Sequence, residues 1–96
     1  MNTTIFFIEN TLSGRRYVGQ TRKNLKSFIK KSKIEMLRSY NNTENELYKQ
    51  MKMCGIANFK ISEIEKHFYR DIRFIKKRME EIVFEMRESG YMVEYL

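Results

Sequence analysis

The sequence has no proline, no tryptophan, one cysteine and one histidine in 96 residues. The single cysteine, Cys54, excludes a disulfide framework within the chain. Together with the single histidine, His67, it also excludes a structural zinc site of the usual cysteine and histidine kind. No apolar run approaches the roughly 20 residues that a membrane-spanning helix needs, and no secretion signal opens the chain. We therefore expect a cytoplasmic protein that does not enter a membrane.

The chain also lacks internal repeats and any low-complexity linker, which predicts one domain over residues 1–96. Its 19 lysines and arginines outnumber its 12 aspartates and glutamates, and the formal net charge is +7. Such an excess favours polyanionic partners, with nucleic acid first and an acidic membrane surface or acidic protein next. Charge alone fits equally well a domain that is merely soluble and cationic.

The strands are predicted from β-branched, aromatic and alternating residues. Residues 4–9 and 16–21 are rich in such residues and indicate two strands, joined by a turn over residues 10–14 into an antiparallel hairpin. Residues 59–64 alternate apolar and polar side chains, as a half-buried strand does. Residues 91–96 leave room for a last short strand.

The helices are predicted from capping residues and apolar spacing. Asn24 is placed to cap a helix, and Asp71 to cap a long final helix that ends at Gly90. A shorter helix over residues 44–54 ends at Gly55. The helix after Asn24 has apolar residues at helical spacing: Leu25, Phe28, Ile29, Met36, Leu37 and Tyr40. The predicted fold is a small α/β (α+β) domain of order β-β-α-α-β-α, with an antiparallel three-stranded sheet flanked by helices.

The hairpin contains the segment Tyr17-Val18-Gly19-Gln20-Thr21, which resembles the second half of the GIY-YIG nuclease signature. Further family motifs are matched in order and spacing by Leu47-Tyr48, by Gly55 with Asn58 and Phe59, by Glu81 with Phe84, and by Gly90-Tyr91. The resemblance implies the family's fold and a Mg²⁺-dependent DNA endonuclease chemistry. In that chemistry a tyrosine helps to activate the nucleophile, an arginine contacts the phosphate and a glutamate holds one Mg²⁺.

The sequence departs from the family at most of its catalytic positions. Thr4-Ile5-Phe6 stands where the family has Gly-Ile-Tyr, Phe28 replaces the arginine, Ser32 a histidine or tyrosine, and Met92 an asparagine. Loss of one charge-stabilising donor typically costs about 10²–10³ in rate. The resemblance therefore implies a degenerate domain, in which Tyr17 and Glu81 are the catalytic remnants and Glu81 is the metal position, with Mg²⁺ the cofactor if the protein is active. Each has a structural alternative: Tyr17 as a strand aromatic and Glu81 as a solvated helix residue.

A run of cations without an intervening acid spans the hairpin and the first predicted helix. It consists of Arg15, Arg16, Arg22, Lys23, Lys26, Lys30, Lys31 and Lys33. We expect it to contact phosphates, although a solvated face is the usual alternative for a charge run. A second basic cluster is expected to be mostly structural, through pairs with acids one helical turn away: Arg70, Arg73, Lys76, Lys77 and Arg78.

Three functions fit these observations. The first is a catalytically degenerate GIY-YIG-like domain that binds nucleic acid, DNA above all, through the basic face. The second is a protein-binding inhibitor module on the same fold, for example a bacteriophage accessory protein that acts on a host enzyme. The third is a residual Mg²⁺-dependent endonuclease.

Overall fold

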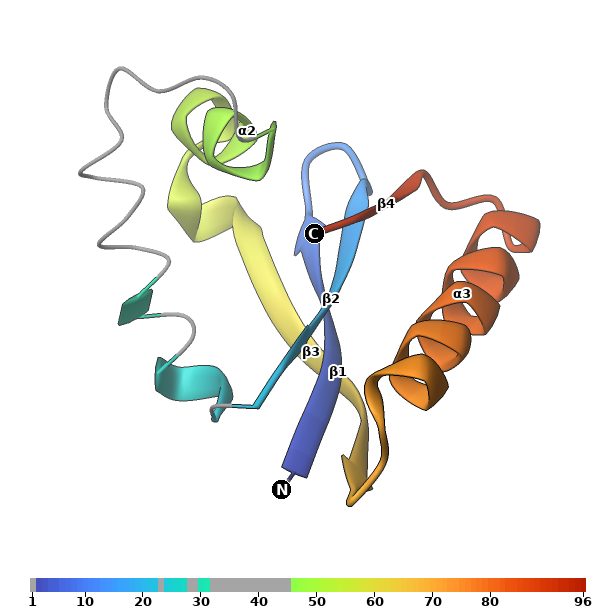
Figure 1. Cartoon of the computed structure of the whole chain (residues 1–96). Helices are drawn as coiled ribbons and strands as arrows, with labels where there is room; N and C mark the ends of the chain where they lie inside the picture. Colours follow the sequence, from blue (N-terminus) through green and yellow to red (C-terminus); the bar gives the residue numbers. More distant parts are fainter. Residues whose placement is uncertain (1, 23, 28–29, 32–45) are drawn as a thin grey trace.

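The computed structural model describes residues 2–22, 24–27, 30–31 and 46–96 of the chain. Its sheet contains β1 (Asn2–Asn10), β2 (Arg16–Thr21), β3 (Phe59–Phe68) and β4 (Val93–Tyr95), in the order β3-β1-β2-β4. The helical elements with full bounds are α2 (Glu46–Cys54), the short 3₁₀ helix η1 (Ile56–Asn58) and α3 (Ile72–Glu88). Figure 1 shows α2 and α3 on opposite sides of the sheet. The α+β class predicted from the sequence is confirmed.

The two faces of the sheet carry separate apolar clusters because successive strand residues point to opposite faces. Ile5 and Val18 pack with the buried stripe of α3, which consists of Ile75, Met79, Ile82 and Val83. Phe6 and Ile8 point the other way and pack with Leu47 and Met51 of α2. The central strand β1 is therefore covered on both faces, and the four consecutive apolar residues Ile5-Phe6-Phe7-Ile8 in its middle follow from that position.

The predicted hairpin is confirmed. β2 has the predicted bounds, while β1 is longer than the predicted 4–9 and begins at Asn2. The two strands pair antiparallel from Thr4 with Thr21 to Glu9 with Arg16. Gly14 closes the turn with a φ of 78°, in the left-handed region that favours glycine.

A bulge in the pairing of β1 with β3 changes which side chains of β3 face α3. Phe6 pairs with Glu63 and Ile5 pairs with Glu65, so Ile64 is an extra residue on β3. Beyond the bulge, Glu65 and His67 face the same side as Ile5, which is the side of α3. The strand was predicted to end at residue 64 and instead runs to Phe68 along the full length of β1.

The prediction of three antiparallel strands is corrected by β4. This strand pairs parallel with β2, from Arg16 with Val93 to Val18 with Tyr95, and makes the sheet four-stranded and mixed. The pairing is continued by hydrogen bonds from Arg16 N to Met92 O at 2.9 Å and from Leu96 N to Val18 O at 2.8 Å. The edge of β2 is thereby covered by the end of the described chain.

The predicted caps are confirmed where the structure describes them. Asp71 Oδ1 accepts a hydrogen bond from Phe74 N at 2.9 Å at the start of α3, and Asn24 Oδ1 accepts one from Ser27 N at 2.8 Å. The helix predicted after Asn24 is helical at residues 25–27 and 30–31, and its remaining part lies outside the described residues. Within the described chain, no helix is long and apolar enough to cross a membrane.

Candidate nucleic-acid interface

The two residues predicted as catalytic remnants lie on opposite sides of the sheet. Tyr17 is 2% exposed and belongs to the cluster between the sheet and α2. Glu81 is on α3, where its side chain is 49% exposed and accepts a hydrogen bond from Arg78 Nη1 at 3.0 Å. It lines a shallow depression with Lys77, Phe84 and two other glutamates, on the side of α3 away from the sheet. The structure does not bring Tyr17 and Glu81 together.

This arrangement fits a Mg²⁺ ion poorly. Glu81 shares its depression with Glu80 and Glu85, but one of its oxygens is already engaged by the Arg78 guanidinium, and Lys77 also lines the depression. Mg²⁺ keeps most of its water and is held weakly unless several carboxylates converge on it. In the described part of the chain, no three histidine, cysteine, aspartate or glutamate side chains lie close enough together to hold a metal ion. The described residues therefore provide no Mg²⁺ site at Glu81.

The position of the family's first tyrosine is filled by Phe6, which is fully buried. Its partner across β1 and β2 is Gly19, the glycine of the Tyr17-Val18-Gly19 motif. A Cβ atom added to Gly19 would lie 3.1 Å from Phe6 Cζ and 3.1 Å from Leu96 Cβ. Any side chain at this position would require Phe6 or Leu96 to shift by a few tenths of an ångström, so Gly19 has a packing role in this chain.

The predicted basic run is divided by the length of β2. Arg15 and Arg16 lie at its start and Arg22 follows its end; β2 itself spans roughly 17 Å from Arg16 to Thr21 at about 3.3 Å per strand residue. Arg16 is held within the fold: its Nε donates to Glu9 Oε1 at 3.1 Å, and its guanidinium carbon lies 3.7 Å from the ring centroid of Tyr91. Arg15 lies 3.9 Å from the carboxylate of Glu94. These two arginines are therefore occupied by contacts at one end of the sheet.

The other predicted phosphate-binding residues follow the opposite end of β2. Arg22, Lys26, Lys30 and Lys31 are exposed there, and Leu25 between them packs against the cluster on the α2 side. Lys23 and Lys33 lie outside the described residues. Figure 1 shows this segment directly after the end of β2, on the side of the sheet away from α3.

The first half of α3 brings a second group of cations to this same end. Arg73, Lys76 and Lys77 are exposed, and no ion pair engages them in the part of the chain that the structure describes. Among the cations of this helix half, only Arg78 is paired, with Glu65 and Glu81. The sequence-based prediction that this cluster pairs with the following acids therefore holds for Arg78 and not for its three neighbours.

Strand register supports the proximity of the two groups. Thr21 at the end of β2 pairs with Thr4, and Thr4 pairs with Lys66 near the end of β3. The residues that follow β2 and those that follow β3 therefore leave the sheet at the same end. We call this surface the basic end and define it by its exposed cations without an ion pair among the described residues: Arg22, Lys26, Lys30, Arg70, Arg73, Lys76 and Lys77.

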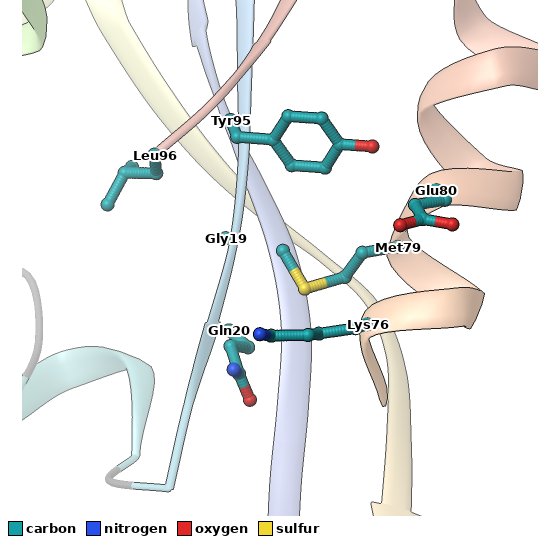
Figure 2. A pocket seen from close by; sticks show the side chains of 7 residues that line it. All are labelled: Gly19, Gln20, Lys76, Met79, Glu80, Tyr95 and Leu96. Atoms are coloured by element: carbon teal, nitrogen blue, oxygen red, sulfur yellow. The ribbon is translucent and has the colours of Figure 1, made fainter. Parts of the chain in front are cut away.

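Lys76 lines an open pocket of about 430 Å³ between α3 and β2. Figure 2 shows its side chain reaching from α3 toward Gln20, the second-last residue of β2, while Tyr95 projects from β4 toward α3. Met79 forms the apolar floor and Glu80 stands one helical turn after Lys76. A phosphate at the Lys76 end would meet an ammonium and an amide, whereas the Glu80 end would repel it.

Sequence reasoning did not single out Gln20, Glu80 or Tyr95 as site residues. The sequence held one signal for Glu80. It follows Lys76 by four residues, the i and i+4 spacing that places two side chains next to each other on a helix, here beside the buried stripe of α3. Tyr95 had no such signal, because its approach to α3 depends on the parallel pairing of β4 with β2.

The opposite flank of α3 is fixed by an ionic cluster around Glu65. Arg78 Nε donates to Glu65 Oε1 at 2.6 Å, and His67 Nε2 donates to the same oxygen at 2.9 Å. Partial burial acts to raise the pKa of Glu65, but the hydrogen bonds from Arg78 and His67 outweigh it and hold the pKa below its ordinary value. The same contact with Glu65 raises the pKa of Arg78. This cluster ties β3 to α3 and thereby orients the cations of the helix.

A scan against protein-family models and searches of curated proteins and of solved structures found no match to this chain. The resemblance to the GIY-YIG family therefore rests on the sequence motifs alone.

Proposed function

We propose that this protein is a degenerate GIY-YIG-like domain that binds nucleic acid, DNA above all, through backbone phosphates at the basic end, without cleaving it. The observation that supports this most is the set of cations in the first half of α3 that have no ion pair among the described residues. Phosphates are the partners for which lysine and arginine side chains provide both charge and hydrogen-bond donors.

The distribution of charge along α3 supports the same proposal. The N-terminal end of a helix dipole carries partial positive charge and favours acids, yet the first turn of α3 contains none. Arg73, Lys76 and Lys77 stand in the first half, and the acids Glu80, Glu81, Glu85 and Glu88 follow in the second. Apart from the N-cap Asp71 and Arg87 in the last turn, this order opposes the helix dipole. An external anion at the basic end would complement the cations of the first half.

The residues at the catalytic positions of the GIY-YIG signature lie too far apart in this fold for cleavage. Tyr17 is buried on the α2 side and Glu81 is exposed on the far side of α3. Phe6 fills the first tyrosine position and has no hydroxyl. Phosphodiester hydrolysis needs a base, a nucleophilic water and stabilising charge around one reacting phosphate, and these residues do not surround a common point.

The proposal uses only part of the predicted phosphate-binding run. Arg22, Lys26, Lys30 and Lys31 remain candidates because they are exposed near the end of β2. Arg15 and Arg16 are left out because Glu94, Glu9 and Tyr91 already engage them.

The test compares two triple variants that lose the same amount of charge. Arg73→Gln with Lys76→Gln and Lys77→Gln removes cations of the basic end. Lys49→Gln with Lys52→Gln and Lys60→Gln removes exposed cations of α2 and of the start of β3. We expect only the first variant to weaken binding of a labelled oligonucleotide in EDTA, and to reduce the slope of log affinity against log salt by roughly 2 for a single strand. Equal weakening by both variants would contradict a localised surface. No binding by the wild type would favour the protein-binding alternative.

A further inference from the structure

The connection between β3 and α3 exposes two consecutive aromatic side chains. Phe68 is 57% exposed and Tyr69 is 87% exposed, the largest value among the large hydrophobic residues of the described chain. The following aromatic residue, Phe74, is held in place by its neighbours. Its ring lies 5.0 Å from that of His67 and 4.7 Å from the guanidinium carbon of Arg70. Tyr69 has no hydrogen bond or ring contact within the described residues. Its ring is directed to solvent.

The backbone at Tyr69 holds this ring outward in an energetically unfavourable conformation. Its φ of 57° is the only positive value at a non-glycine residue in the described chain. Glycine or asparagine is the usual occupant of this region, and a bulky aromatic residue is uncommon there. Residues held in such conformations cluster at binding sites, where the surrounding structure maintains them. Packing does not explain why a tyrosine occupies this position, because its exposed side chain makes almost no packing contacts.

The cations around Tyr69 are those of the basic end. Arg70 follows it directly, and Arg73 lies in the first turn of α3. Aromatic side chains interleaved with cations are the arrangement by which proteins hold single-stranded nucleic acid: cations follow the phosphates, and rings stack on the unpaired bases. In a duplex the bases are stacked on one another and offer no free face to a protruding ring.

We infer that Tyr69, with Phe68 beside it, is a stacking platform for an unpaired base, so that the basic end binds single-stranded nucleic acid more tightly than duplex. This inference rests on the proposed function, since the phosphate contacts of the basic end bring the strand to the ring. Stacking is tolerant of base identity, so the platform adds affinity for unpaired strands without reading a sequence.

The test uses three labelled probes of equal length in EDTA at low salt: a single strand, the matching duplex, and a strand of abasic sites that keeps its phosphates. The variants are Tyr69→Ala, the conservative Tyr69→Phe, and Phe84→Ala as a control that removes an exposed ring from the far face of α3. Tyr69→Gly is a second loss-of-ring variant that suits the backbone conformation. Circular dichroism establishes that each variant is folded.

We expect Tyr69→Ala and Tyr69→Gly to bind the single strand roughly 5- to 100-fold more weakly than the wild type. Tyr69→Phe and Phe84→Ala should bind it as the wild type does, and all variants should bind the abasic strand equally. Salt-sensitive binding of all three probes with no effect of Tyr69 would overturn the inference and leave phosphate binding intact. Absence of salt-sensitive binding to any probe would overturn both.

Discussion

Phe6 and Gly19 face each other across β1 and β2, and a Cβ added to Gly19 would lie 3.1 Å from Phe6 Cζ. The atom Cζ is where a tyrosine carries its hydroxyl. The Phe6 ring is thus enclosed by Gly19 and by the apolar cluster on the α2 side. This packing leaves little room for a hydroxyl at Cζ.

Phe6→Tyr, which introduces the tyrosine of the GIY-YIG signature, is expected to destabilise the protein. The new hydroxyl would be buried at a position where the native side chain is 0% exposed, at a cost of about 1–3 kcal/mol in free energy of unfolding if it finds no partner. Urea denaturation measures the difference. Phe74→Tyr is the matched control, because its partly exposed ring allows the hydroxyl to reach water. An unchanged stability of Phe6→Tyr would show that the site still accommodates a tyrosine.

Tyr69→Gly is expected to separate stability from binding. A non-glycine residue in the left-handed region costs about 1–2 kcal/mol, and glycine has no such cost. Glycine also loses more backbone entropy on folding, so the net gain in free energy of unfolding should be at most about 1 kcal/mol. Thermal or urea unfolding measures it. A clear loss of stability would mean that the Tyr69 ring contributes packing, contrary to its exposure.

The Glu65 cluster predicts how stability depends on pH. The pKa of Glu65 is lower in the folded state than its ordinary value of 4.5, because the hydrogen bonds from Arg78 and His67 outweigh partial burial. Its contribution is therefore present above about pH 4.5 and is lost as the pH falls through the folded pKa. We expect Glu65→Gln to be less stable than the wild type at pH 7, and the two to converge at low pH. A stability difference that does not change with pH would contradict this role of the carboxylate.

Glu81→Gln is expected to have little effect. Its ion pair with Arg78 is half exposed on the glutamate side, and such pairs contribute about 0.2–1 kcal/mol. Nucleic-acid binding in EDTA should not weaken, because Glu81 carries no positive charge, although it lines the same depression as Lys77. If the protein instead retains endonuclease activity, incubation of a plasmid with Mg²⁺ would produce cleavage that Glu81→Gln abolishes.

Local signals in the sequence predicted the elements whose formation depends on local chemistry. The strand over residues 16–21 and the caps Asn24 and Asp71 were predicted correctly, because hairpin patterning and capping act within a few residues. The extension of β3 to Phe68 was missed. Glu65 and His67 are polar and indicate no strand, yet pairing with β1 and the contact with Arg78 stabilise them there.

The features that depend on distant parts of the chain were not predictable in the same way. The parallel pairing of β4 with β2 requires α3 to return the chain to that edge of the sheet. The strand propensity of three residues is too small to indicate this pairing. The run of cations looked continuous in sequence. An extended strand separates Arg16 from Arg22 by its own length, whereas the fold brings Lys76 toward Gln20. The basic end is thus assembled by tertiary structure.

Fluorescence anisotropy of a labelled single-stranded oligonucleotide, titrated with wild-type protein in EDTA at several salt concentrations, tests phosphate binding most directly. We predict that log affinity falls linearly with log salt concentration, with a slope of about −0.7 for each phosphate contact, because neutralised phosphates release counterions. Binding that is absent at low salt, or that does not change with salt, would contradict the proposal that the basic end binds nucleic acid through its phosphates.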